Sequence, residues 1–406
     1  MKDKREFDVI LYGATGYTGR LVAEYLAVAS SSKDLRWAVA GRNRIRLEQI
    51  SERLGGVDVI VGDALDSEAM RNLASRARVV CTAVGPYTRY GSELVAACVR
   101  ARTHYCDLAG ELPWMREMID THHERARAAG TRIVHCCGFD SIPSDMGVLM
   151  MHEAMREHGA RLGRVDALFG ESKAGISGGT IASIVAVMSR AIKDPRIRRI
   201  LLDPYALDPR PRMGGADGRD ALGIGFDRRV GRWTAPFFMS VINTRVVRRS
   251  NALGGYPFGR EFRYTERMSL ETGFKGFAMA AAATAGHLGF VAVTAISPLR
   301  SVLLRWLPRP GEGPGEAYRK SGYFVLRLVA ESNEESPVRL FGRIADNRDP
   351  GYDCTAIMLG ESAMCLAQDN LETPGGVLTP ASAMGMRLID RLRTAGMDWR
   401  VGSSLM

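Results

Sequence analysis

The amino-acid sequence predicts an α/β protein with a doubly wound parallel sheet and a second, α+β domain. A glycine-rich turn at residues 13–19 joins an apolar run to an amphipathic stretch, as at a strand-to-helix connection. Short apolar runs then alternate with polar helical stretches, which is typical of a parallel sheet covered by helices. From Tyr318 onward, apolar and polar residues alternate as in half-buried strands, so we expect a second sheet there.

The first strand and its turn are the most informative part of the chain. The apolar run Val9–Tyr12 is followed by Gly-Ala-Thr-Gly-Tyr-Thr-Gly. Glycines here let the chain turn sharply, admit a pyrophosphate close to backbone N–H groups and bring the next helix close to the sheet. The order strand, turn, helix predicts a Rossmann-type dinucleotide site with phosphates at the helix N-terminus. The expected cofactor-binding residues are Gly13, Thr15, Gly16, Tyr17, Thr18 and Gly19.

The residues after the second and third strands indicate which cofactor binds. An NAD site usually carries Asp or Glu after the second strand, but here Trp37–Ala40 is followed by Gly41, Arg42 and Asn43. A guanidinium can pair with a 2′-phosphate and lie on the adenine, so Arg42 predicts NADP(H). Arg42 and Asn43 are therefore assigned to the cofactor. Asp63 ends the third strand, 57–63, where it is expected to touch the adenine or to cap a helix.

The next three strands place further side chains on the ligand edge of the sheet. The fourth strand, 79–84, stops at Gly85, Pro86 and Tyr87, and we assign Ala83, Val84 and Gly85 to the cofactor. The pattern then predicts a fifth strand at 104–108, a helix at about 113–129 and a sixth strand at 132–137. We expect the sheet to be complete with this sixth strand. The polar turn 138–145 follows on the same edge.

These residues resemble the saccharopine dehydrogenase-like oxidoreductases. The motifs are GATGYTG, VGPYTRYG, HYCDLAGE and CGFDSIPSD. Residues 243–253, 263–266 and 379–385 resemble the trans-acting enoyl reductase branch of that family. The resemblance implies NADPH-dependent reduction of a 2-enoyl thioester, presented by the acyl carrier domain of a polyketide synthase or held in another lipid thioester. It also implies that the last helix returns to the first domain, which gives domains 1–140, 141–375 and 376–406.

An enoyl reduction needs a donor for the enolate oxygen and an acid for the α-carbon. We expect Tyr87 to fill one of these roles, with Asp140 and Ser141 orienting it or the nicotinamide, and with Tyr90 as second choice. A packed loop tyrosine and a helix-capping turn are the alternatives. None of the lysines has a tyrosine four residues before it, which excludes the short-chain dehydrogenase pair Tyr-x-x-x-Lys.

Positive charge is concentrated in one region of the chain. The net charge is +10, and residues 190–263 hold 16 Lys and Arg against 7 Asp and Glu. Such a region suits an acidic carrier domain, phosphates or an anionic membrane, and a solvated surface without a partner is the alternative. We expect Arg245, Arg248 and Arg249 to attract the carrier. Nucleic acid is not expected, since no binding module is recognised.

Residues 276–299 contain no Asp, Glu, Lys or Arg. They are long enough to span a bilayer, but the alanines, the glycines and Pro298 weaken that interpretation. A membrane-surface or partner-binding element and a buried helix or acyl-pocket wall stay open beside it. The chain shows no signal peptide, so we expect a cytoplasmic protein, with peripheral membrane contact left open. The seven cysteines are interpreted as reduced core residues, and no metal site is expected.

Two other functions stay open on the sequence. One is an NADP-linked reductase of an imine or amino acid, for which Arg245, Arg248 and Arg249 would bind carboxylates. The other is a non-catalytic NADP-binding protein at a lipid surface.

Overall fold

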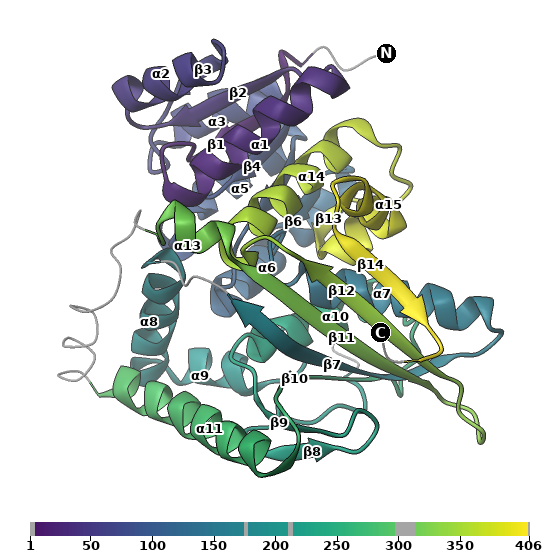
Figure 1. Ribbon diagram of the computed structural model, residues 1–406. Coiled ribbons are helices and arrows are strands. Elements are labelled where there is room, and N and C mark those ends of the chain that lie inside the picture. Colours follow the sequence, from purple (N-terminus) through teal and green to yellow (C-terminus); the bar gives the residue numbers. More distant parts are fainter. Residues whose placement is uncertain (1–4, 174–177, 210–213, 297–312, 405–406) are drawn as a thin grey trace.

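The computed structural model describes residues 5–173, 178–209, 214–296 and 313–404. It contains two seven-stranded sheets with helices around and between them (Figure 1). The first sheet has the strand order β13-β6-β5-β4-β1-β2-β3, and the second has the order β14-β12-β11-β7-β10-β9-β8. The predicted fold class, a Rossmann-type α/β sheet with a second domain, is confirmed.

Every strand pair of the first sheet is parallel. Parallel strands covered on both faces are apolar along their length, and all six residues of β1 are buried. The strands are β1 (Phe7–Tyr12), β2 (Trp37–Gly41), β3 (Asp58–Val61), β4 (Ala77–Thr82), β5 (His104–Asp107), β6 (Arg132–Val134) and β13 (Gly376–Leu378). The helices in this part are α1 (Tyr17–Lys33), α2 (Arg44–Arg53), α3 (Ser67–Arg76), α4 (Tyr87–Tyr90), α5 (Ser92–Ala101) and α6 (Leu112–Ala128).

The sheet does not end at the sixth strand, as the sequence suggested. Strand β13 pairs in parallel with β6 and adds a seventh strand from near the end of the chain. Three residues are too few to show a strand period, and the partner lies more than two hundred residues away, so no local pattern announces this strand. The last strand, β14 (Asp398–Gly402), instead pairs with β12 in the second sheet.

The second sheet is mixed. Its centre is the long strand β7 (Leu162–Lys173), which pairs in parallel with β10 (Arg263–Ser269) and antiparallel with β11 (Tyr323–Ser332). The sheet is extended by β12 (Arg339–Asp346), β9 (Arg232–Pro236) and β8 (Gly225–Asp227). The helices in this part are α7 (Ile142–Glu157), α8 (Gly178–Lys193), α9 (Pro195–Leu202), α10 (Ser240–Leu253), α11 (Gly273–Ala295) and α13 (Glu316–Lys320). The strands predicted over 323–329 and 339–344 are confirmed as parts of β11 and β12.

Two late helices close the core between the sheets. Helix α14 (Thr355–Gln368), which follows a π-helical turn at Pro350–Cys354, is buried from Thr355 to Ala367 and lies against α1, β1, β4 and β5. Helix α15 (Pro380–Thr394) packs on α14 and α7. Thr379 is the N-cap of this helix in a capping box, and Pro380 is its first residue. All seven cysteines are buried and free, as expected of reduced core residues.

The apolar segment is a helix on the outside of the molecule. Helix α11 lies at the lower edge of Figure 1, and most of its side chains are exposed. A buried helix, one of the alternatives that the sequence left open, does not fit the described part of this segment. Residues 297–299 of that segment lie outside the described residues.

Candidate functional site

The glycine-rich turn has the shape that a dinucleotide site requires. Gly13 has φ +96°, and a Cβ there would lie 2.4 Å from Cγ2 of Val84. A Cβ on Gly19 would lie 2.1 Å from the carbonyl oxygen of Gly13. The N–H of Gly16 donates to that same carbonyl at 3.0 Å and closes the turn. Val84 thus leaves no room for a side chain at Gly13, and the backbone of Gly13 leaves none at Gly19. The turn therefore has to carry glycine at both positions.

The start of α1 fits the phosphates of a dinucleotide. Its N-cap, Gly16, has no side-chain hydrogen bond, and the first turn carries no acidic residue. The backbone N–H groups and the positive end of the helix dipole therefore face outward for an anion. Thr15 and Thr18 flank this end and are half-buried.

The side chain of Tyr17, one of the expected cofactor residues, makes contacts outside the glycine-rich turn. Its hydroxyl donates to the carbonyl of Pro314 at 2.6 Å, and its ring meets that of Tyr352 edge-on at 4.7 Å between centroids. Its side chain therefore ties the glycine-rich turn to the chain just before α13. The backbone of Tyr17 stays in the first turn of α1.

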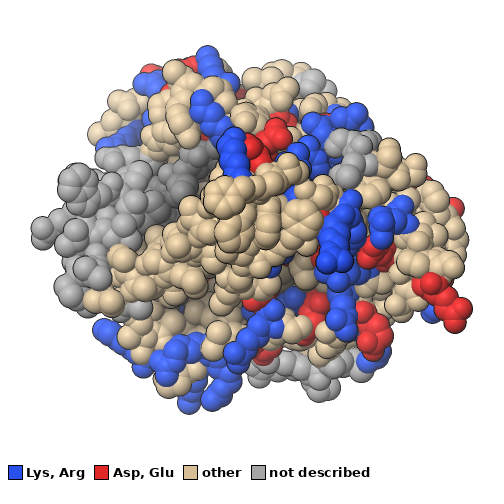
Figure 2. All heavy atoms as spheres, turned by 60° about the horizontal axis from the view of Figure 1, so that its bottom comes forward, with Lys and Arg blue, Asp and Glu red and all other residues tan. Residues whose placement is uncertain are grey.

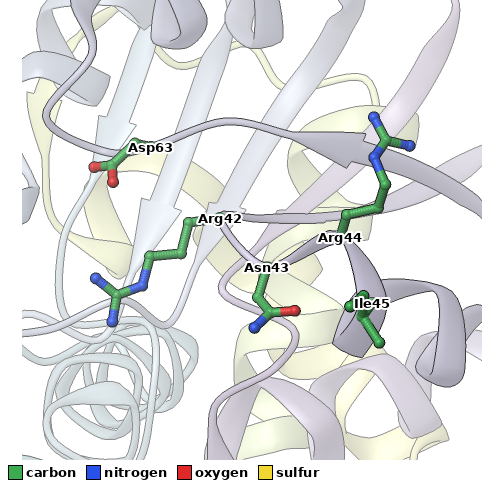
Figure 3. A pocket seen from close by; sticks show the side chains of 5 residues that line it. All are labelled: Arg42, Asn43, Arg44, Ile45 and Asp63. Carbon is green, nitrogen blue, oxygen red and sulfur yellow. The ribbon is translucent and has the colours of Figure 1, made fainter.

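A hollow of about 500 Å³ lies beyond the ends of β2 and β3. It is lined by Arg42, Asn43, Arg44, Ile45 and Asp63 (Figure 3). Arg42 and Asp63 extend to the same side, whereas Arg44 points away from them and pairs with Glu48 at 3.6 Å. Three of the predicted cofactor residues thus line one hollow.

The hydrogen bonds of this hollow leave Arg42 available. Asn43 is the N-cap of α2 and accepts from the N–H of Arg46 at 3.0 Å. Asp63 accepts from the N–H of Leu65 at 2.9 Å, and Asp66, not Asp63, caps α3. Arg42 is exposed, and the described residues offer it neither a hydrogen bond nor an ion pair. An unpaired guanidinium beside a hollow fits a phosphate group on the ribose.

Tyr87 is a packed tyrosine, the alternative to the role expected for it. Its hydroxyl donates to the carbonyl of Thr82 at 3.2 Å and accepts from the N–H of Leu108 at 3.0 Å. Its ring stacks on Trp114, and burial raises the pKa of the hydroxyl well above its ordinary value. The one proton that a phenol can donate is already used, so Tyr87 holds the ends of β4 and β5 together.

Glu111 anchors this edge, and the sequence analysis assigned it no role. Its carboxylate is buried and accepts from the N–H groups of Tyr87 at 2.7 Å and Thr88 at 2.9 Å. It also accepts from the hydroxyl of Thr88 and, at 3.0 Å, from that of Ser183 in α8. The loop after β4 is thereby fixed and joined to the second domain. Only the position of Glu111 in the motif HYCDLAGE could have drawn attention to it.

Asp107 and His135 form a second buried anchor. One carboxylate oxygen of Asp107 lies 2.7 Å from Nδ1 of His135 and accepts from the hydroxyl of Tyr105 at 2.9 Å. The other oxygen accepts from the N–H groups of Ala109 and Cys136. The ends of β5 and β6 are thus locked side by side, just before the turn that carries Asp140.

Asp140 remains the most suitable acid among the predicted catalytic residues. It is half-buried on the ligand edge, and no described side chain hydrogen-bonds its carboxyl group. Burial, reinforced by the charge of Asp107, raises the pKa of Asp140 to about 6. An acid with this pKa holds its proton in part of the population near neutral pH, as a general acid must. Tyr90, the second choice, is half-buried beneath the guanidinium of Arg89.

Ser141 is turned away from this edge. It is fully buried, and its hydroxyl donates to Oδ1 of Asn243 at 2.8 Å. Nδ2 of Asn243 donates in turn to Glu266 at 3.0 Å, and Glu266 accepts from the hydroxyl of Tyr264 at 2.6 Å. Ser141 occupies the N-cap position of α7 but makes no capping hydrogen bond. Ser141 therefore joins α7 to α10 and, through Asn243, to β10, and its hydroxyl donates away from Tyr87.

The buried carboxyl of Glu266 predicts a pH-dependent stability. Burial raises its pKa from 4.5 to about 7, so the folded state keeps a proton that the unfolded chain releases. This contribution is complete below about pH 4.5 and is lost as the pH rises through about 7, at a cost of about 3 kcal/mol. Glu266→Gln, which mimics the protonated acid, should remove most of that loss. Urea unfolding of both proteins between about pH 5 and pH 8 measures it. Equal pH slopes would show that Glu266 titrates normally.

The arginines assigned to carrier docking are structural. Arg245, Arg248 and Arg249 are all buried in α10. Arg245 pairs with Asp220, and Arg248 pairs with Asp217 at 2.8 Å. Arg249 donates to the carbonyl oxygens of Leu207 and Val377, and its burial lowers its pKa to about 9. The expectation that they attract a partner is wrong, because charge in a sequence does not reveal burial. Because the protein's own oxygens already bind these guanidinium groups, the three arginines are not available to bind substrate carboxylates.

Comparisons with known proteins agree with this geometry. Residues 9–134 match the family described as the saccharopine dehydrogenase NADP-binding domain. The chain is 43% identical to a protein of Mycobacterium tuberculosis provisionally named as a trans-acting enoyl reductase, and 39% identical to the trans-acting enoyl reductase of Mycobacterium leprae; each alignment covers 97% of both chains. Saccharopine dehydrogenase (L-glutamate-forming) from Saccharomyces cerevisiae has a similar structure, with TM-score 0.54, 13% identity and 97% of this chain covered. At that identity the likeness concerns the fold alone.

Proposed function

Because the chain belongs to the trans-acting enoyl reductase family, we propose that it reduces a 2-enoyl thioester with NADPH. The relatives that carry this name match it over almost its whole length. The observation that carries the proposal is the glycine-rich turn together with the hollow beside Arg42, which fit the pyrophosphate and the 2′-phosphate of NADPH. When bound, NADPH supplies a hydride for the β-carbon of the enoyl group.

The chain's own residues have three tasks in this reaction. The turn and the first N–H groups of α1 bind the pyrophosphate, and Arg42 binds the ribose phosphate. Glu111 and Asp107 are positioning residues, which hold the loops at the ends of β4, β5 and β6. Asp140 is the acid that gives a proton to the α-carbon, because its raised pKa keeps it partly protonated and its carboxyl has no competing side chain.

We propose that the substrate arrives as a thioester on the acyl carrier domain of a separate polyketide synthase, in the cytoplasm where NADPH is regenerated. The support is the family name, since an enzyme that acts in trans receives its substrate from another protein. The alternative reduction of an imine or amino acid loses the support of Arg245, Arg248 and Arg249, which are buried and bind carboxylate and carbonyl oxygens of the protein itself.

The decisive experiment is an assay for turnover. Purified protein is mixed with NADPH and a short enoyl-pantetheine thioester, and the loss of NADPH absorbance is followed together with the saturated product. Product formation is expected. NADPH binding without turnover, on the short thioester and on carrier-bound substrate alike, would instead favour the non-catalytic alternative. Reduction of an imino acid in place of the thioester would move the protein to the amino-acid class.

Arg42 predicts the cofactor preference. NADPH should bind about 10- to 100-fold more tightly than NADH, which is the value of one charge-assisted phosphate contact. Arg42→Asp should erase or reverse this preference, and fluorescence titration of both cofactors measures it. Arg46→Asp is the matched control, since Arg46 is an exposed arginine of the adjoining helix α2 that does not line the hollow. Equal affinities of the unmodified protein for the two cofactors would contradict the assignment.

A further inference from the structure

Helix α11 presents its large apolar side chains to the outside. It begins at Gly273, ends at Ala295 and contains a single charged residue, Lys275. Its most apolar stretch of 18 residues has a mean hydropathy of 1.5, yet only 17% of that stretch is buried. A helix that is apolar all round is normally enclosed by a protein core or by lipid. The described protein does not enclose α11.

The inner and outer sides of α11 differ in the size of their side chains. Its buried positions are Gly276, Ala280 and Thr294, and Gly276 sits so close to Trp233 of β9 that a Cβ would lie 3.0 Å from that ring. The large side chains face outward instead: Phe274 is 84% exposed and Leu288 is 49% exposed. In a helix adapted to water the large apolar residues point inward. The reversed arrangement is the one that gives contact to an apolar phase outside the protein.

Several of the exposed apolar side chains lie on α11 or on elements next to it. Of the eighteen large ones in the described residues, five lie on α11, and Ile192 lies on α8, which packs on α11. The ring of Trp233 connects Phe226 of β8 to Phe277 of α11, with centroid distances of 5.2 and 5.0 Å. An apolar surface of this extent marks a site of interaction.

Cations border this surface. Helix α8 packs on α11 and leads into α9. Lys193 at the end of α8 and Arg196 and Arg199 in α9 are exposed and have no ion pair in the described part of the chain. Figure 2 shows this face, with a broad uncharged band and Lys and Arg atoms along its lower and right borders. An anionic bilayer suits such a surface, because its acyl region takes up apolar side chains and its headgroups attract cations.

We propose that α11 and its bordering cations form a membrane-contact surface, by which the protein lies on an anionic lipid bilayer. Among the exposed groups, Phe274, Phe277, Leu288 and Val291 enter the acyl boundary, and Lys193, Arg196 and Arg199 meet the headgroups. The surface connects to the candidate site through α8, whose Ser183 donates to Glu111 at 3.0 Å. Half-buried Ile184, Val187 and Met188 lie between these two ends.

Vesicle co-sedimentation tests the apolar part. The full chain should sediment with vesicles of phosphatidylcholine and phosphatidylglycerol. Phe274→Asp combined with Leu288→Asp should lower the partition coefficient about 100-fold or more. Val28→Asp is the matched control, because Val28 is 77% exposed on α1, far from this surface, and should leave the partition coefficient unchanged. Equal losses in all variants, or no binding by the unmodified chain, would overturn the proposal.

The charged part has its own test. Replacing Lys193, Arg196 and Arg199 by Gln should weaken binding to the anionic vesicles about tenfold or more, and added salt should do the same. Binding to vesicles of phosphatidylcholine alone should be unchanged. Replacement of Arg71, Arg100 and Arg125, which are exposed on α3, α5 and α6, is the control and should have no effect. An equal effect of both replacements would show that net charge acts without a defined surface.

Other occupants of α11 give different results. Alkaline carbonate should release the bound protein, and retention would mean that α11 spans the bilayer. Self-association in sedimentation velocity that Phe274→Asp abolishes, without vesicle binding, would mean a contact between two copies. Either result would overturn the proposal. All of these variants should reduce the short thioester normally, so failure of the membrane surface is distinguishable from failure of the proposed reaction.

Discussion

Asp140→Asn is expected to lower the rate of enoyl reduction by about 10²-fold or more, while NADPH affinity stays within about twofold. Asparagine keeps the size of the side chain but cannot give up a proton to carbon. The unmodified enzyme should also lose activity as the pH rises above about 6, since only protonated Asp140 acts as an acid. The variant should show no such decline. Single-turnover kinetics across this pH range measure both effects.

Two comparisons make the result for Asp140 specific. Glu266→Gln changes another buried acid with a raised pKa, but that acid lies among α7, α10 and β10, so the decline above pH 6 should persist. Tyr87→Phe should change stability more than rate, because its hydroxyl bonds only to backbone. If Asp140→Asn keeps the normal rate and pH profile, the proton comes from another group or from water.

Gly19→Ala is expected to raise the Kd for NADPH about 100-fold or more, because overpacking backbone against backbone costs about 3 kcal/mol or more. The added Cβ would lie 2.1 Å from the oxygen and 2.8 Å from the carbon of the Gly13 carbonyl, and neither atom can rotate away. The turn must then open. Fluorescence titration gives the affinity, and unfolding without cofactor shows whether the fold survives.

Two other glycines separate local strain from general damage. At Gly16 the nearest atom to an added Cβ is 3.4 Å away and φ is −73°, so Gly16→Ala should fold normally and lose less affinity than Gly19→Ala. Gly218→Ala meets nothing within 4 Å and should match the unmodified protein. Normal NADPH affinity of Gly19→Ala would show that the turn is not the phosphate site.

The part of the site that could be predicted from sequence is the part whose residues are neighbours in the chain. The glycine-rich turn and the residues after β2 and β3 owe their positions to adjacent strands, so their spacing alone predicts where they meet. Arg42 was found in this way because its role depends on the end of one strand.

The anchors at the ligand edge could not be found in that way. Glu111 meets Ser183, and Ser141 meets Asn243, across 72 and 102 residues of chain. Such contacts depend on how the second domain packs, which no local period encodes. Packing also decides how the residues of α10 and α11 lie. It buries the charged residues of α10 and exposes the apolar residues of α11, against the usual preference of each residue type.

The contact of Tyr17 with Pro314 couples nucleotide binding at the glycine-rich turn to the position of the chain before α13. One residue belongs both to the turn that faces the phosphates and to the clasp on the chain before α13. A nucleotide that stabilises this position of Tyr17 strengthens the clasp by the same free energy by which the clasp strengthens nucleotide binding. A contact that strengthens the clasp then raises the affinity for the nucleotide, whichever of the two forms first.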